Sequence, residues 1–480
     1  MTVRDRADRR LDLILLFACA ALALIPGLGQ NRSWAPREVR HAEIIREMVA
    51  SGDYLLPTLM GEPYLHKPPV MHAAAALLAP LAGGPSMLVA RLPSALAGIL
   101  GILAAYGLGR FLTHRRGALL GATGLLAMPG YNSLAREARP DMIFCAAMLA
   151  ACLALAGGML AQRGSRRSLL FCLGGIAAGV AVLTKGPHGL LLPLVFVWLA
   201  PTKRHDLKRP RLGWLAFVAG LALILALWAV PLCVHEGGEY LRGMWRQIGS
   251  DIGGDKGGES LLIYLWLSFI MTLPLSLFLP LTVTRAGRAG SKTVLGMAAA
   301  TLLTVALIPK KRGHYLLPAY PFFALGLASA VVDCAESRPW VRRWAWWLVA
   351  AFVAAVPVYS LILQPALRPE EPDLVFAREV LATVEPQALV FCPEDVRETL
   401  AWVGRRHDRF RKLSDRLPRA VRDVSNAPRG SYVIVPESDL GPIMEGLGQT
   451  SLDRLMDRRV NSERLILLRL GQSRPSTPSR

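Results

Sequence analysis

The sequence predicts a polytopic α-helical membrane protein that ends in a small soluble α/β domain. Apolar runs of about 17–25 residues recur along the first 365 positions, and each is long enough to cross a bilayer. The short loops that would lie on one side of the membrane are rich in Lys and Arg. Near residue 370 the composition changes to that of a soluble domain. We therefore expect about eleven spans, with ten to thirteen as the range, within residues 1–365, and the soluble domain in residues 366–480.

Eleven apolar segments are the predicted spans, and a long loop, 29–89, joins the first two. One further apolar segment, 68–82, is short and begins with Pro68-Pro69, so we interpret it as an interfacial or re-entrant piece. The predicted spans are 11–28, 90–112, 117–134, 141–161, 168–184, 187–201, 212–234, 260–284, 293–309, 315–333 and 343–363.

The distribution of basic residues predicts the orientation. If the N-terminus is cytoplasmic, five short Lys/Arg-rich loops fall on the cytoplasmic side, in agreement with the positive-inside rule. The net charge of +20 is spread over these loops and is not massed on one soluble face, so we expect contact with anionic lipid and not with nucleic acid. The basic loops are 114–116, 163–167, 203–211, 285–292 and 338–343.

The opposite face then receives the long first loop and the C-terminal domain. Within the loop, residues 38–49 have a helical pattern, with Ala42, Ile45 and Val49 on one face, and are expected to lie on the membrane surface. Long ordered loops are often functional. We therefore look for chemistry in this loop and at the outer ends of the spans.

The C-terminal region has the pattern of a small α/β unit. Short apolar runs at 388–391, 432–435 and 465–468 predict strands, and 396–403 and 440–447 predict helices between them. The region has no Gly-rich phosphate loop and no catalytic triad signature. We expect a stabilising or partner-binding appendage.

Several motifs in the first 335 residues resemble those of the bacterial ArnT-like glycosyltransferases, relatives of the protein O-mannosyltransferases. The first external loop carries three of them, WAPREVRHAEIIREM at 34–48, SGDY at 51–54 and GEPYLHKPP at 61–69. Each motif alone is weak, but their order and spacing together are specific, and the resemblance covers about residues 10–335. It continues at 90–95, 138–142, 183–187 and 310–321.

The resemblance implies a GT-C fold and transfer of a sugar from a polyprenyl-phosphate donor to a lipid or other cell-envelope acceptor. It places the reaction at the outer face of a bacterial inner membrane, with the active site and the C-terminal domain periplasmic. Cations beside a departing lipid phosphate stabilise its developing charge. The candidates for binding the donor phosphate are Arg40, Lys67, Lys185, Lys311 and Arg312.

These cations have a simpler alternative. Interfacial Lys and Arg residues commonly extend toward lipid headgroups without any catalytic role. We favour function because Lys67, Lys185, Lys311 and Arg312 lie on one predicted face at positions that match the family.

Two carboxylates are the candidate catalytic groups, as a general base or to orient the acceptor. Asp141 begins an apolar span directly after Arg139-Pro140, where a carboxylate is costly, and matches the Asp of the family in this segment. Its alternative role is capping of the helix. Glu38 is the second candidate, in the first loop.

The chain departs from the family pattern at three places. Arg37 stands where the family has the Asp regarded as catalytic, so Glu38 acts as the base or the chain is a non-catalytic relative. His66 replaces a Glu that the family links to a metal, so a divalent metal at His66 is an open alternative, although no cofactor is firmly expected. Arg246-Gln247 replaces a frequent Glu-His pair.

A membrane transporter is the remaining alternative. Transport sites usually carry ionisable residues near the middle of spans or an inverted repeat of broken helices. Few ionisable residues lie near the span centres here, and no such repeat is apparent. We therefore favour a glycosyltransferase over a transporter.

Overall fold

The computed structural model describes residues 3–30, 38–200, 211–253, 261–280, 289–306, 312–336, 338–367, 370–447 and 452–471. It divides the chain into two compact units. The first unit comprises Met1–Gln30, Asp53–Pro57 and Tyr64–Pro365, and the second comprises Asn31–Gly52, Thr58–Pro63 and Ala366–Arg480. The second unit thus combines two pieces of the long first loop with the C-terminal region. Lys311 and Arg37 lie outside the described residues.

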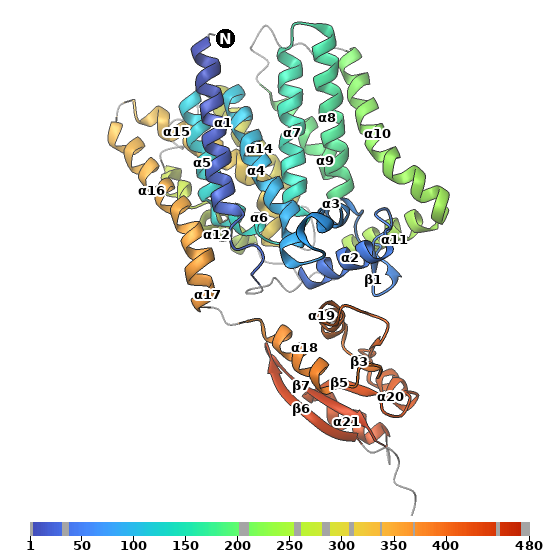
Figure 1. Ribbon diagram of the computed structural model, residues 1–480. Helices are drawn as coiled ribbons and strands as arrows, with labels where there is room; N and C mark the ends of the chain where they lie inside the picture. The colour runs from blue at the N-terminus through green and yellow to red at the C-terminus, as the bar shows by residue number, and fades with distance from the viewer. Residues whose placement is uncertain are drawn as a thin grey trace, which may run out of the picture. The chain divides into compact units, whose positions relative to one another are not determined.

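The first unit is helical (Figure 1). Its longer helices are α1 (Val3–Leu24), α3 (Val70–Leu78), α4 (Met87–Leu112), α5 (Arg115–Ala127), α6 (Pro129–Ala135), α7 (Asp141–Leu160), α8 (Gly164–Lys185), α9 (His188–Leu199), α10 (Arg211–Glu236), α11 (Glu239–Gly253), α12 (Leu261–Met271), α14 (Ala289–Ala306), α15 (Tyr320–Cys334) and α16 (Pro339–Val358). Short helical turns are η1 (Ala79–Ala82), η2 (Leu275–Phe278), η3 (Gly313–Ala319) and η4 (Tyr359–Leu363), and the chain passes to the second unit within α17 (Gln364–Leu367).

Each of the eleven predicted spans contains a helix, but two of them are interrupted. The segment 117–134 is divided between α5 and α6 because Pro129 cannot continue the helix that precedes it. In the segment 260–284, α12 ends at Met271, shortly before Pro274, and the short helical turn η2 follows. The segment 68–82 forms only the short α3 and η1.

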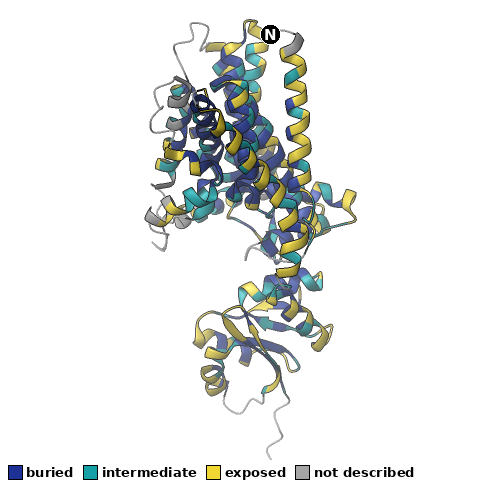
Figure 2. Cartoon of the chain, turned by 90° about the vertical axis from the view of Figure 1, so that its left-hand side faces the viewer, coloured by how far each residue is buried: buried dark blue, intermediate teal, exposed yellow. Residues whose placement is uncertain are grey.

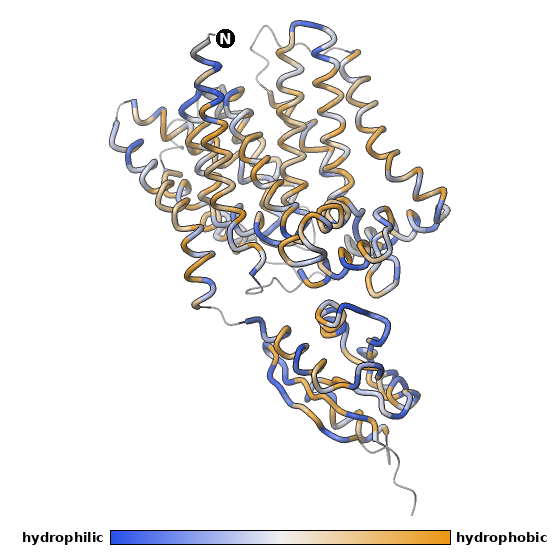
Figure 3. Tube along the Cα trace, viewed as in Figure 1, coloured by the Kyte–Doolittle hydropathy of each residue, from blue (hydrophilic) through white to orange (hydrophobic). Residues whose placement is uncertain are grey.

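Within the described residues, six helical segments are long and apolar enough to cross a membrane. Figure 3 shows hydrophobic residues along these helices and hydrophilic residues gathered near their ends. The six segments are Met87–Leu112, Asp141–Leu160, Gly164–Lys185, Arg211–His235, Gly313–Cys334 and Pro339–Leu367.

Glycines allow helices of this unit to pack closely against each other. Helices α8 and α10 lie side by side (Figure 1), and a Cβ added at Gly175 or at Gly220 would collide with the backbone of the other helix. Between apolar helices, glycines let backbones approach and gain van der Waals contact. Figure 2 shows buried residues concentrated inside the helical bundle.

The second unit is built on a five-stranded mixed sheet in the order β4-β3-β5-β7-β6. Strand β5 pairs in parallel with β3 and antiparallel with β7, and Tyr432 opposes Arg469 in the latter pair. The strands are β3 (Val390–Cys392), β4 (Phe410–Lys412), β5 (Tyr432–Pro436), β6 (Leu452–Val460) and β7 (Glu463–Leu470). The helices around them are α18 (Pro372–Thr383), α19 (Glu394–Gly404), α20 (Leu417–Ser425) and α21 (Glu437–Leu447).

Both faces of this sheet are covered. Alternate residues of β5 enter different cores, with Tyr432 and Ile434 in one and Val433 and Val435 in the other, as the two-residue period of a strand requires. The strands predicted at 388–391, 432–435 and 465–468 and the two predicted helices are confirmed.

The first-loop part of the second unit consists of helix α2 (Glu38–Ser51) and a hairpin of β1 (Thr58–Leu59) and β2 (Glu62–Pro63). Helix α2 packs against α19, and Met60 at the hairpin tip enters the core formed by α18, α19 and the sheet. The polar side of α2 is buried as well as its apolar side, because Glu43, Arg46 and Glu47 are all buried. A helix resting on a membrane surface would expose those side chains, so partners within this unit must satisfy them.

Candidate active site

Asp141 lies at the start of α7, immediately after Pro140. Only 1% of the residue is exposed. An acidic residue in the first turn interacts favourably with the helix dipole. A buried carboxylate nevertheless needs partners, and Asp141 has three cationic or titratable neighbours.

Lys185 is the main partner of Asp141. It is the last residue of α8, and its Nζ lies 2.5 Å from Oδ1 of Asp141. The chain reverses directly after it through Gly186, whose φ of 83° suits glycine, and enters α9. The end of α8 and the tight turn after it therefore place the ammonium group of Lys185 beside the start of α7.

Aromatic rings complete the surroundings of Lys185. Its Nζ lies 4.8 Å from the centroid of the Tyr315 ring and 5.8 Å from that of Phe144. Ammonium groups at such distances are attracted by the negative face of a ring. Lys185 is therefore held by a carboxylate and two rings, which orients its charge.

His314 and Arg139 complete the cluster. Nε2 of His314 lies 3.9 Å from Oδ1 of Asp141, and Nε of Arg139 lies 3.5 Å from Oδ2. His314 also makes an edge contact with the ring of Tyr315, at 4.6 Å between centroids. Three chain segments, the starts of α7 and η3 and the end of α8, thus meet at one carboxylate.

Two more predicted cations belong to the same unit. Lys67 is half-buried and interacts electrostatically with Asp141 and His314. Arg312 is half-buried at the N-terminal end of η3, two residues before His314, and its carbonyl accepts the backbone N–H of Tyr315. Excess positive charge around one carboxylate is an arrangement that can accept an anion such as a phosphate.

The other two predicted residues lie on α2 in the second unit. Glu38 is buried in the first turn of this helix. Nε of Arg40 donates a hydrogen bond to Oε1 of Glu398 on α19 at 2.8 Å. Burial raises the pKa of Glu398 to about 7, and the charge of Arg40 opposes that rise.

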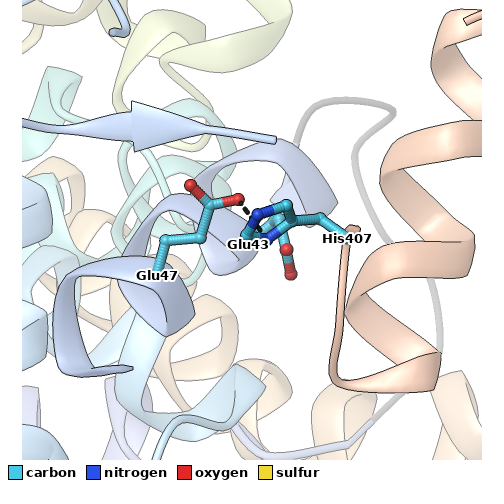
Figure 4. Close-up of side chains that lie close together, drawn as sticks. All are labelled: Glu43, Glu47 and His407. Carbon is cyan, nitrogen blue, oxygen red and sulfur yellow. Dashed lines mark ion pairs between the residues drawn. The ribbon is translucent and has the colours of Figure 1, made fainter. Parts of the chain in front are cut away.

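His66 is exposed, and its ring lies 5.3 Å from that of Tyr64. The group with metal-ligand spacing in the described chain consists instead of Glu43, Glu47 and His407, whose ligand atoms lie within 4.8 Å of one another (Figure 4). This set does not suit a metal as it stands, because Nη2 of Arg46 donates to Oε1 of Glu43 at 2.7 Å and lies 3.3 Å from Nδ1 of His407. A guanidinium thus provides the positive charge that an ion would provide.

Sequence reasoning did not assign a role to His314, Tyr315 or His407. His314 and Tyr315 lie within the motif at 310–321, which was the available signal for them. Nothing in the sequence relates His407 to the first loop, because their separation exceeds 350 residues. Glu43 and Glu47 had a signal in their four-residue spacing, which puts both on one face of a helix.

Comparison with known families supports the motif resemblance. The family model described as dolichyl-phosphate-mannose-protein mannosyltransferase matches residues 66–229. The protein named undecaprenyl phosphate-alpha-4-amino-4-deoxy-L-arabinose arabinosyl transferase from Aeromonas salmonicida is 27% identical over 367 residues, covering 72% of this chain and 66% of the relative. Its counterpart from Pseudomonas aeruginosa is 30% identical over 336 residues, covering 67% and 59%. This chain thus spans about two thirds or less of the length of these relatives.

Solved structures share the fold. The crystal structure of ArnT from Cupriavidus metallidurans bound to undecaprenyl phosphate matches with a TM-score of 0.75 at 18% identity, covering 95% of this chain and 97% of that one. The Archaeoglobus fulgidus oligosaccharyltransferase matches with a TM-score of 0.55 at 12% identity, covering 92% and 71%. The fold is therefore that of the GT-C glycosyltransferases, as the motifs predicted.

Proposed function

Because this chain is a relative of the ArnT-like and protein O-mannosyltransferase-related GT-C glycosyltransferases, we propose that it transfers a sugar from a polyprenyl-phosphate donor to a lipid or other cell-envelope acceptor. In this proposal it is a multi-pass protein of a bacterial inner membrane. Its N-terminus is cytoplasmic, and its active site and soluble C-terminal domain are periplasmic.

The observation that carries the proposal is the ion pair of Asp141, which is buried, with Lys185, which is half-buried. Both residues are at the ends of apolar helices, where a lipid-anchored phosphate would enter. Arg139 and Lys67 add to the positive surroundings, and His314 lies beside them. Buried ionisable groups that converge in this way are typical of functional sites.

The cations act on the leaving group. As the bond between the anomeric carbon and the phosphate oxygen breaks, that oxygen takes the electron pair and gains negative charge. Lys185, already oriented by Asp141 and Tyr315, stabilises that charge in surroundings of low dielectric constant. Lys67, Arg312, Lys311 and Arg40 are proposed to assist in binding the phosphate.

A carboxylate acts on the acceptor. A hydroxyl acceptor forms the new bond to the anomeric carbon with its oxygen and gives its proton to Asp141 or Glu38 as general base. An acceptor that is already an anion, such as a lipid phosphate, needs no base. This second case would explain how the chain tolerates Arg37 where relatives carry an Asp.

The test is transfer of labelled sugar from a panel of polyprenyl-phosphate sugars to total envelope lipid, by purified protein in lipid vesicles. We expect transfer by the native protein, and we expect Lys185→Ala to lower it by roughly 100-fold or more. The matched control is Arg166→Ala, an exposed cation at the opposite end of α8, which should retain full activity.

Two variants distinguish an active enzyme that uses Glu38 as its base from a relative that has lost catalytic activity. Transfer that is abolished by Glu38→Ala places the base one residue after Arg37. No transfer from any donor by the native protein, with activity gained by Arg37→Asp, would instead identify a non-catalytic relative that keeps only the fold.

A further inference from the structure

The polar contacts of α2 converge on the C-terminal part of the second unit. This helix buries ten of its fourteen residues, including Glu38, Glu43, Arg46 and Glu47. Charged side chains remain buried only when other groups satisfy them. The partners of Arg40 and Arg46 outside the helix come from α19 and from the loop that follows it, more than 340 residues away in sequence.

At one end of α2, Arg40 is paired with Glu398. The two side chains are joined at 2.8 Å, and Glu398 is only 4% exposed. Because Glu398 lies on α19, this pair fixes the first turn of α2 to that helix.

At the other end, Arg46 and His407 form the second connection. Arg46 donates two hydrogen bonds to Glu43, at 2.8 and 2.7 Å, and its Nη1 donates to the carbonyl of Arg405 at 3.3 Å. Nδ1 of His407 lies 3.3 Å from Nη2 of Arg46 and 3.3 Å from Oε1 of Glu47. Figure 4 shows the imidazole of His407 directed between Glu43 and Glu47.

Glu47 extends this connection to the β1–β2 hairpin. It accepts hydrogen bonds from the hydroxyl of Thr58 at 2.6 Å and from the backbone N–H groups of Met60 and Gly61 at 2.7 and 3.2 Å. A Cβ at Gly61 would lie 3.2 Å from Nε2 of His407, so the hairpin closes over the imidazole. Arg46, Glu47 and His407 therefore connect the helix, the hairpin and the loop after α19.

We propose that His407 is a positioning residue, which locks α2, and with it Glu38 and Arg40, onto the C-terminal α/β domain through Arg46 and Glu47. This proposal rests on the sugar-transfer function for its consequence, because Glu38 and Arg40 are candidates for acceptor activation and donor binding. If His407 has this role, the C-terminal domain contributes to sugar transfer by holding α2 in place and is more than an appendage. The guanidinium of Arg46 takes the place that a metal ion would occupy between Glu43 and His407.

The test compares His407→Ala, His407→Gln and, as a matched control, Asp408→Ala. Asp408 is on the same loop but pairs with Arg406. Gln offers both an acceptor for Arg46 and a donor for Glu47, so it should preserve the connection. Hydrogen–deuterium exchange is measured over α2 and over β5 and β7, together with kcat and KM for transfer by the full-length protein in vesicles.

We expect His407→Ala to speed exchange in α2 at least tenfold while β5 and β7 keep their protection. We also expect kcat to fall roughly tenfold to a hundredfold, because small displacements of catalytic groups are that costly. His407→Gln and Asp408→Ala should behave like the native protein. If the native protein transfers no sugar, the proposed function fails, yet the exchange in α2 still decides whether His407 holds this helix.

Three results would overturn the proposal. His407→Ala could leave the exchange of α2 and kcat unchanged. It could instead open β5 and β7 as much as α2, which would indicate a general folding role. The native protein could also bind Zn²⁺ with an affinity that His407→Ala abolishes, and Zn²⁺ could slow exchange in α2, in which case the cluster is a metal site.

Discussion

Asp141 and Lys185 compensate each other's charge in the folded protein. Removing one member of a buried ion pair leaves an uncompensated charge, whereas removing both does not. We expect Asp141→Ala to lower the free energy of unfolding by about 3 kcal/mol or more, and the double variant with Lys185→Ala to be less damaged than Asp141→Ala. Unfolding midpoints in detergent micelles measure this. Additive losses in the double variant would mean that the two charges are not coupled.

Glu398 predicts a pH dependence of stability in the second unit. Burial raises its pKa from 4.5 to about 7, so the folded protein binds this proton more tightly than the unfolded chain does. The stabilisation is complete below about pH 4.5 and is lost as the pH rises through about 7. At about 1.4 kcal/mol per pKa unit, the effect amounts to a few kcal/mol at most.

Unfolding of the native protein and of Glu398→Gln between about pH 5 and about pH 8 measures this dependence. The variant should lose less stability than the native protein as the pH rises. The control Glu385→Gln, at an exposed carboxylate paired with Arg469, should follow the native curve. Parallel curves for native protein and Glu398→Gln would show that Glu398 is already ionised at low pH.

The candidate site residues could be identified from the sequence more readily than the residues that contact them. Asp141 and Lys185 stood out because charged groups at the ends of apolar segments are costly, and both lie in recognised motifs. Their pairing with His314 depends on how α7, α8 and η3 pack, which no local pattern encodes. The same holds for Arg40, whose partner Glu398 lies 358 positions away.

At the scale of elements, the turn between α8 and α9 determines where Lys185 lies. A Cβ at Gly189 would meet the backbone of Ala181 at 2.5 Å, and backbone cannot move aside as a side chain can. Gly189→Ala should therefore separate the two helices, lower stability by about 1–3 kcal/mol and reduce transfer. The control is Gly164→Ala, where nothing lies within 4 Å of the added Cβ. Unchanged stability and activity in Gly189→Ala would show that the turn does not constrain Lys185.

Two of the strands that were not predicted, β6 and β4, have weak local patterns. Strand β6 lies at the edge of the sheet and is rich in Asp and Arg, which is typical of edge strands and unlike a buried apolar run. Strand β4 has only three residues. Helix α2 was recognised, but its burial on both sides was not, because its charged face resembles a solvated one until Arg46, Glu47 and His407 are seen together.

At the scale of the whole molecule, the orientation of the chain can be tested by chemical labelling. In a variant without the seven native cysteines, Ser165→Cys in the basic first turn of α8 should react with a membrane-impermeant maleimide only after permeabilisation. Glu62→Cys and Ser438→Cys, in the first loop and the C-terminal domain, should react in intact spheroplasts. Labelling of Ser165→Cys from outside would reverse the orientation and remove the basis for a periplasmic site.

Binding of undecaprenyl phosphate itself tests whether Lys185 contacts the lipid phosphate, since this ligand requires knowledge of neither the sugar nor the acceptor. Titration calorimetry in detergent compares the native protein with Lys185→Ala and with Arg166→Ala at the opposite end of the same helix. We expect saturable binding that weakens at least tenfold in Lys185→Ala, by about 1.4 kcal/mol or more, and is unchanged in Arg166→Ala. Equal affinity in all three proteins would contradict the assignment of the Asp141–Lys185 cluster as the site of the lipid phosphate.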